Sequence, residues 1–340
     1  MPEKKLSYYD KLTETVNNAL IKFTDSKHQE RVDEELEIIR NMDDPENIAH
    51  QFLFTSQLIA SMHMMVGPGC GNMCSSLINY LLSITDIDPI KYKLNPYLFF
   101  RSNMSGLSWY FEVPDGEVDS FMEVYERISR QENFNIRLIV MSNSQLTEIR
   151  DLSTSSWKEL NHPFEVSFDH GANLRYMYKI MSHVPFPELE YLGTPLATYT
   201  RLTQHPINFE EMLVAYQDSC RIPEHDYTSF GPNGMKFCEE VFDKLELQAE
   251  IPKEKSVECW RRLISEHASQ VPKEMLDTVR QRLKAAHYGD EYIDSFINSL
   301  EYRYRSLTPK TNIITPIMLD MEIAYLKTYF CHGPLSNLLY

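Results

Sequence analysis

The stretch that most constrains this 340-residue chain is residues 66–101, VGPGCGNMCSSLINYLLSITDIDPIKYKLNPYLFFR. It opens with glycines at positions 67, 69 and 71. Glycines in this arrangement let backbone N–H groups approach a phosphate closely. A helix-like run over residues 73–83 follows, so a phosphate held by the loop would also face a positive helix N-terminus. A glycine turn before a helix fits either a phosphate site or an ordinary turn.

The residues after the loop are more specific. They read TDIDP at 85–89, KY at 91–92 and LFFR at 98–101. This order resembles the palm of the bacterial replicative DNA polymerases of family C, the DNA polymerase III alpha subunits. That family has Gly-Pro-Gly-Arg-Gly-Ser, then Gly-Ile-Thr-Asp-(Ile/Val)-Asp-Pro-Leu-Lys-Tyr and Leu-Phe-Glu-Arg-Phe. The resemblance implies an α+β fold: a polymerase-beta-like nucleotidyltransferase palm, with a mixed sheet and helices, and a reduced helical fingers-like region.

The loop departs from the family's nucleotide-binding pattern. Cys70 and Asn72 stand where the family has Arg and Ser. A cysteine cannot supply the guanidinium group that binds a triphosphate through two hydrogen bonds. We therefore expect the loop to keep its shape but to bind a triphosphate more weakly. The resemblance implies a vestigial nucleotide-binding set of Gly67, Gly69, Gly71, Asn72, Lys310 and Lys327.

The catalytic acids of the family are expected on the next strand. Its palm strand carries alternate aspartates, which share one face and can hold two Mg²⁺ ions for phosphoryl transfer. A gapless continuation places Gly106, Ser108 and Tyr110 at these acid positions. Glycine and serine cannot replace a carboxylate as an anionic metal ligand. The expectation is therefore no metal site, with Mg²⁺ as the cofactor only if the chain is active.

A rival alignment finds acids at alternate positions in PDGEVDSF, namely Asp115, Glu117 and Asp119. Gly116 interrupts this would-be strand, and FMEVYERI continues at helical spacing. These features favour the opening of a helix at Pro114, with the acids in its first turn, where the dipole favours negative charge. A displaced catalytic strand remains the alternative at this point.

The family pattern returns at PELEYLG, residues 187–193. Glu190 stands where the resemblance places the third catalytic aspartate. A single carboxylate cannot hold a two-metal centre alone. Glu190 is therefore either a remnant ligand or a glutamate on an edge strand beside a turn.

Periodicity predicts several further elements. Residues 5–40 read as two helices with a break at 24–26. Residues 30–39, ERVDEELEII, resemble the family's helix that leads towards the palm, with its charges on a solvated face. Residues 47–65 suggest a buried helix or strand, and residues 136–141, IRLIVM, a buried strand.

The C-terminal part resembles the Gram-positive PolC branch of the family. EYIDS at 291–295, TPKTN at 308–312 and IAYLKTY at 323–329 carry the likeness. Glu322 replaces an arginine of that branch, and a charge reversal beside a phosphate is unfavourable.

Proline and glycine mark expected boundaries in this part of the chain. Pro316 is expected to interrupt a helix. A helix beginning at Pro272 is expected to end at residue 288, with Gly289 as its C-cap.

Charge argues against tight binding to bare DNA. The chain has 33 Lys and Arg against 49 Asp and Glu, a net charge of −16. Binding by phosphate neutralisation needs basic patches, so we expect weak or no autonomous DNA binding and a protein partner, for example a replication protein. The sequence shows no apolar run of membrane-spanning length and no signal-peptide core, which favours a cytoplasmic protein without membrane contact.

We therefore expect N-terminal helices at 1–45, a degenerate palm-like domain at 46–205 and a helical fingers-like region at 206–340. The favoured function is that of a shortened, catalytically degenerate polymerase relative, a non-catalytic binding or regulatory protein linked to DNA replication. One alternative is a divergent metal-dependent DNA polymerase or nucleotidyltransferase that uses Asp115, Glu117 and Asp119 with Glu190. Another is an interaction protein that presents an acidic surface to a protein partner.

Overall fold

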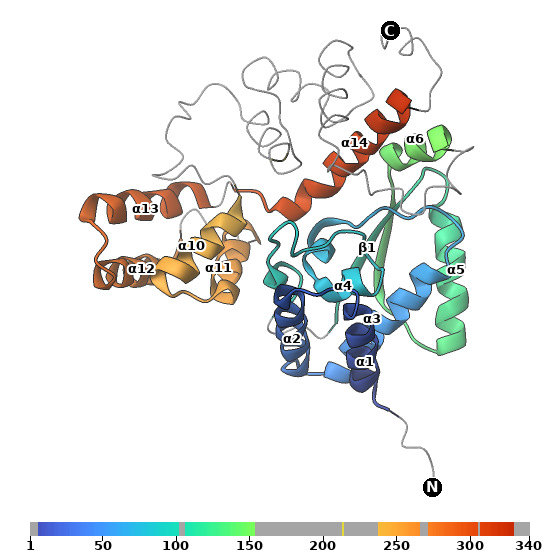
Figure 1. Ribbon diagram of the computed structural model, residues 1–340, viewed down its shortest axis with the longest axis horizontal. Helices are drawn as coiled ribbons and strands as arrows, with labels where there is room; N and C mark the ends of the chain where they lie inside the picture. The colour runs from blue at the N-terminus through green and yellow to red at the C-terminus, as the bar shows by residue number, and fades with distance from the viewer. Residues whose placement is uncertain are drawn as a thin grey trace. The chain divides into compact units, whose positions relative to one another are not determined.

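The computed structural model describes residues 6–101, 106–153, 213, 237–265, 271–304 and 307–329. It divides into two compact units, residues 1–216 with 313–340, and residues 217–312. The N-terminal helices thus share a unit with the glycine loop, and the last helix belongs to that unit as well. The described part is mostly helical, with one two-stranded parallel sheet (Figure 1).

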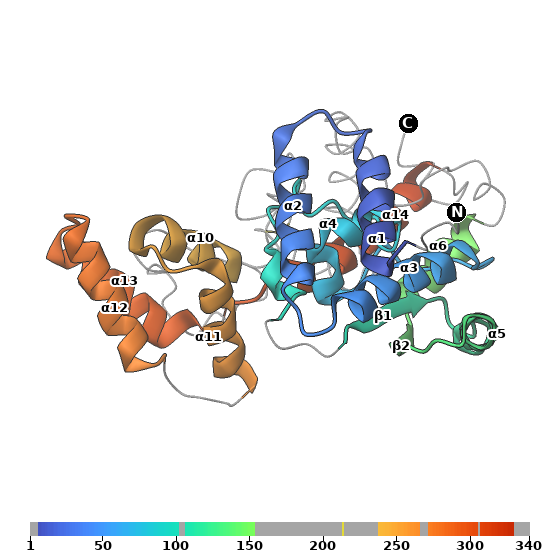
Figure 2. The ribbon, with the colours of Figure 1, turned by 90° about the horizontal axis from the view of Figure 1, so that it is seen from below.

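Three capped helices open the first unit: α1 (Tyr8–Leu20), α2 (Ser26–Arg40) and α3 (Pro45–Ala60). Figure 2 shows α1 and α2 side by side. The side chains of Ser7, Asp25 and Asp44 accept the first free backbone N–H groups of these helices. The expected pair of helices with a break at 24–26 is confirmed, and 47–65 is mainly a helix.

The segment after the glycine loop is not the single helix expected over residues 73–83. It forms a 3₁₀ helix, η1 (Gly71–Ser75), and a five-residue helix, α4 (Leu77–Leu81). Ser76 lies between them in an extended conformation, and its hydroxyl accepts the N–H of Asn79. The polar side chain at Ser76 favours a new helix start over continuation of the helix. A second short 3₁₀ helix, η2 (Pro96–Leu98), follows.

The sheet is a parallel pair of β1 (Ser108–Val113) and β2 (Arg137–Ser142), with α5 (Val118–Glu132) between them in the chain. One face of β1 buries Trp109, Phe111 and Val113 in the core. The helix start predicted near residue 115 is confirmed. The strand predicted at 136–141 is also confirmed, but it is only partly buried, and Met141 is 41% exposed.

Helix α6 (Ser144–Ser153) follows β2 and packs against α14 (Ile314–Tyr329) (Figure 1). The expectation that Pro316 interrupts this helix is wrong. Pro316 falls in the first turn, where a missing N–H costs little because the first backbone donors have no partner within the helix.

The second unit contains four α-helices in its described residues, α10 (Cys238–Ala249), α11 (Lys253–Ser265), α12 (Lys273–Ala285) and α13 (Asp290–Arg303). A 3₁₀ helix, η6 (Lys310–Asn312), follows them. The core of this unit includes Phe242, Trp260 and Tyr304, whose hydroxyl donates to the Ser256 carbonyl at 2.7 Å. Gly289 is not the C-cap of α12 as expected. It is the N-cap of α13, and the chain leaves α12 through His287, which has a positive φ of 63°.

In the described parts of the chain, no helix combines the length and apolar character needed to cross a membrane.

Candidate functional site at the glycine loop

The glycine loop lies along one edge of β1. The N–H of Gly67 donates to the carbonyl of Glu112 at 2.8 Å, as a neighbouring strand would. Two residues back on the strand, the N–H of Tyr110 donates to the Met73 sulfur at 3.0 Å. The loop and the strand that the resemblance assigns to a catalytic palm are therefore in direct contact.

Two carbonyl groups of the loop accept hydrogen bonds from other segments of the first unit. The Pro68 carbonyl accepts the N–H of Asp86 at 2.6 Å, and the Gly69 carbonyl accepts the Thr315 hydroxyl of α14 at 2.7 Å. Gly69 has a φ of 143°, and a Cβ there would lie 2.9 Å from the sulfur of Cys74. Glycine at this position is required by close packing inside the protein, whatever else the loop does.

Glu112 is the residue of this site that the sequence reasoning did not single out. Its side chain is hydrogen bonded to the Cys70 thiol and to Asn143, and burial raises the pKa of its carboxyl. Burial and the nearby Glu112 raise the pKa of the Cys70 thiol to about 12, so the thiol keeps its proton and donates it. The signal was available, because Glu112 continues the alternation of Ser108 and Tyr110 by one more step along the strand.

The three positions aligned with the family's acids are placed as follows. Ser108 and Tyr110 lie on the half-buried face of β1, the same face as Glu112. Gly106 lies just before the strand, where a Cβ would be 3.3 Å from the amide nitrogen of Gln51. Gln51 also accepts the N–H of Leu107 at 3.0 Å. Glu112 is thus the one carboxylate on β1.

The acids of the rival alignment lie in a turn and a helix start. Asp115 is in the turn after β1, Glu117 is the N-cap of α5, and Asp119 is in its first turn. The N–H of Asp115 donates to the Thr147 hydroxyl at 2.7 Å, and Glu117 is 3.2 Å from the guanidinium of Arg150. The residues at 114–119 do not form a strand, so the alternation does not place the three carboxylates on one strand face.

The remaining expected site residues are only partly described. Lys310 belongs to the second unit, where its N–H donates to the buried Glu239 at 2.9 Å and its ammonium lies 5.5 Å from the centre of the Phe237 ring. Lys327 is in α14, and its side chain is not described; Glu190 lies outside the described residues. Asn72 lies in η1 beside the loop.

Glu322 of α14 is 2% exposed, and burial raises its pKa to about 8. At neutral pH its carboxyl is therefore mainly protonated. The charge reversal expected from its replacement of an arginine does not arise.

In the part of the chain that the structure describes, no three His, Cys, Asp or Glu side chains are grouped so as to hold a metal ion.

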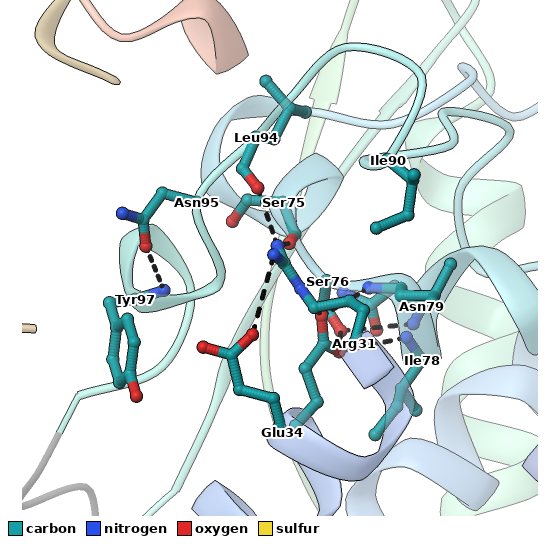
Figure 3. A network of polar contacts seen from close by, with 12 residues as sticks. Arg31, Glu34, Ser75, Ser76, Ile78, Asn79, Ile90, Leu94, Asn95 and Tyr97 are labelled. Atoms are coloured by element: carbon teal, nitrogen blue, oxygen red, sulfur yellow. Dashed lines mark hydrogen bonds and ion pairs between the residues drawn. The ribbon is translucent and has the colours of Figure 1, made fainter. Parts of the chain in front are cut away.

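A buried polar network fixes the segment behind the loop (Figure 3). Glu35 of α2 is fully buried and accepts the N–H groups of Leu77 and Ile78 at 2.8 and 3.1 Å, which makes it the anionic cap of α4. It also pairs with Arg31 at 2.8 Å. The expectation that the charges of residues 30–39 form a solvated face is therefore wrong for these two residues.

The comparisons cover the segment that contains the glycine loop and β1. A family model of the bacterial DNA polymerase III alpha NTPase domain matches residues 7–119. Residues 7–119 are distantly related to that domain. The match runs from α1 through the glycine loop and β1 to the first turn of α5.

Each match to an individual relative covers only a small part of that much longer protein. The DNA polymerase III subunit alpha of Helicobacter pylori strain J99 is 31% identical over 179 residues, 49% of this chain and 14% of that protein. The Mycoplasma pneumoniae subunit is 35% identical over 95 residues, 27% of this chain and 10% of its own. A Staphylococcus epidermidis subunit is 44% identical over 73 residues, which are 21% of this chain and 6% of that protein. The homology is partial, and this chain spans about a seventh of the H. pylori protein.

Proposed function

We propose that this chain is a catalytically degenerate relative of the DNA polymerase III alpha subunit that works as a non-catalytic binding or regulatory protein in DNA replication, in the cytoplasm. In this proposal the sheet and glycine loop are a reduced palm, and α10–α13 are a reduced fingers region close to the PolC branch. The observation that carries it is the face of β1 beside the loop, which presents Ser108, Tyr110 and a single acid, Glu112.

The chemistry of this face supports a loss of catalysis. In-line phosphoryl transfer with two metal ions needs carboxylates that bridge or flank both ions. The one carboxyl on β1 is already hydrogen bonded to the Cys70 thiol and to Asn143, and a single carboxylate cannot hold two metal ions alone. Where the family has an arginine that could grip a triphosphate, Cys70 offers no positive charge.

The same face is suited to a protein partner. Register pairs Tyr110 with Ile139 and Glu112 with Met141, so two apolar side chains of β2 share this face of the sheet with Tyr110 and Glu112. The net charge of −16 opposes binding to bare phosphates and favours a protein over nucleic acid. A replication protein is the partner class that fits the relatedness of residues 7–119.

Primer extension tests the loss of catalysis. The purified chain is given a primed template, all four deoxynucleotides and Mg²⁺ or Mn²⁺. We expect no incorporation above the level of an empty preparation. Incorporation that is lost in Glu112→Gln and kept in Glu117→Gln, a matched change in the Arg150 ion pair, overturns the proposal.

A pull-down from extract tests the binding role. Proteins captured by the full chain should persist after nuclease treatment if contact is direct. Tyr110→Glu, which places a charge on the half-buried face of β1, should reduce their recovery, whereas Glu37→Lys on the exposed side of α2 should not. Recovery of nucleic acid alone contradicts a protein partner.

A divergent nucleotidyltransferase is a second candidate, and Glu112 is the observation that favours it. Its carboxyl lies beside the glycine loop on the strand where the family carries its acids. This candidate requires Glu190, Asp115 or another acid to supply the second ligand. The primer-extension series above separates it from the first, because only this candidate expects metal-dependent incorporation that Glu112→Gln removes.

A further inference from the structure

His28 of α2 is held between two carboxylates from different parts of the first unit. Its Nδ1 lies 2.7 Å from Asp25, the N-cap of its own helix, and its Nε2 lies 3.2 Å from Asp88. The ring stacks on Phe23 at 4.3 Å, and the residue is 7% exposed.

The geometry specifies the protonation state of the ring. A neutral imidazole has one N–H donor and one acceptor nitrogen, and ionised carboxylates only accept. Both carboxylates are already fixed by backbone donors: Asp25 accepts the N–H of Lys27 at 3.0 Å, and Asp88 accepts the N–H of Ile90 at 2.8 Å. Only an imidazolium, with two N–H donors, satisfies both contacts at once. A neutral ring must give up one of them, and the longer bond to Asp88 is the weaker.

Asp88 connects this contact to the glycine loop. It belongs to the TDIDP segment, and two residues earlier the N–H of Asp86 donates to the Pro68 carbonyl within the loop at 2.6 Å. The side chain of Asp88 also closes the turn at Ile90. The histidine therefore links the start of α2 to the TDIDP segment, which is hydrogen bonded to the glycine loop.

We propose that His28 is a proton-operated latch: its imidazolium fastens residues 85–91 to α2, and loss of the proton releases Asp88 and loosens the support of the glycine loop. This inference concerns the conformation of the first unit and does not depend on the proposed function.

The surrounding charges set the direction of the response. The charged groups that act on the imidazole are Asp25 and Asp88, and their hydrogen bonds raise its pKa above the ordinary value of 6.5 although burial opposes this. Tyr92, beside Asp88, has its pKa raised to about 12 by burial and stays neutral. A raised histidine pKa contributes stability that is fully present below the unfolded value and is lost as the pH rises through the folded value. The latch is thus closed at mildly acidic pH and opens on the alkaline side.

Two measurements on the full chain test the latch. Nitrogen-15 spectra of the histidine rings should show both nitrogens of His28 protonated at about pH 6 and one proton lost at higher pH. Amide exchange, corrected for the intrinsic rate, should show the protection factor of the Ile90 N–H falling as the pH rises through the pKa of the folded His28. The total fall should be about tenfold for each pH unit by which folding raises that pKa. The Asn143 N–H, bonded to the Val113 carbonyl at 2.8 Å and away from the latch, should keep its protection over the same range.

Variants separate the latch from a general effect of pH. In His28→Gln the protection at Ile90 should no longer depend on pH. In His50→Gln, which changes a histidine stacked between Tyr8 and Phe134, the dependence should persist. A His28 ring with one protonated nitrogen at mildly acidic pH overturns the proposal. So does protection at Ile90 that is independent of pH in the unaltered chain, a result that needs no variant to fold.

Discussion

Replacing Glu35 by glutamine should destabilise the first unit by about 3 kcal/mol. The carboxylate accepts four donors, two on each oxygen: Arg31 and the Leu77 N–H on one, Ser76 and the Ile78 N–H on the other. An amide nitrogen accepts none of them. The least costly orientation places it toward Ser76, whose hydroxyl can turn to accept, and leaves the Ile78 N–H without a partner.

The magnitude follows from two terms. A buried backbone donor left unsatisfied costs about 1–3 kcal/mol. The charge that compensates Arg31, whose side chain is 12% exposed, is lost as well, and breaking a buried ion pair from one side costs about 3–5 kcal/mol when nothing replaces it. Arg31 keeps the carbonyls of Ser75 and Leu94 as acceptors, which reduces the second term. Glu35→Ala removes the acceptor for all four donors and should cost more than the glutamine.

Urea unfolding of the full chain measures this. Because there are two compact units, a single transition cannot be assumed, so Trp109 should be made the sole tryptophan and followed by fluorescence. The matched control is Glu37→Gln on the exposed side of the same helix, where the pair with Arg40 is worth less than about 1 kcal/mol. A loss for Glu35→Gln no larger than that of the control refutes the reasoning.

Three further predictions concern the loop and the second unit. Gly69→Ala, which combines a positive φ with a Cβ 2.9 Å from the Cys74 sulfur, should cost about 3 kcal/mol, whereas Gly71→Ala, with open space around it, should cost about 1 kcal/mol in the same urea assay. Equal losses would show that the packing is not tight. Thr315→Val should cost about 1–2 kcal/mol by leaving the Gly69 carbonyl without its donor, and an unchanged midpoint would contradict that bond. Burial raises the pKa of Glu239 to about 7 from 4.5, so the folded second unit holds a proton that the unfolded chain has released. Its unfolding free energy should therefore fall by about 3 kcal/mol as the pH rises from 4.5 to 7. Glu239→Gln should abolish this fall, and an equally steep fall in the variant would rule out Glu239 as its source.

Elements governed by local rules could be predicted from the sequence. The break between α1 and α2, the helix start near residue 115 and the strand IRLIVM all rest on spacing and on residues within a few positions. The incorrect predictions of secondary structure lie where a residue distant in the chain determines the local conformation. The run over residues 73–83 has helical spacing, but Glu35, 42 residues from Leu77, caps a new helix start inside it.

The relation to the polymerases was predictable from the sequence, but the contacts around the glycine loop were not. The glycines and TDIDP lie within residues 7–119, which match the DNA polymerase III alpha NTPase domain, and the functional role of this segment stays a prediction. Gly69 suggested close approach to a phosphate, yet the structure also uses it for packing on Cys74, which no local pattern reveals. Glu112 was missed because the expected spacing of acids ended one step before it on β1. Its bond to Cys70 joins residues far apart in the chain and shows only in three dimensions.

The most direct test of the central claim is a titration of the full chain with Mn²⁺ in the presence of a deoxynucleoside triphosphate, read from the amide resonances of Gly67, Gly69 and Gly71. A bound paramagnetic ion broadens resonances close to it, so a working site beside Glu112 would erase these signals at saturating, stoichiometric concentrations. We predict no saturable broadening at the loop. Saturable loss of the three signals that requires the nucleotide, together with a response that disappears in Glu112→Gln, would contradict it.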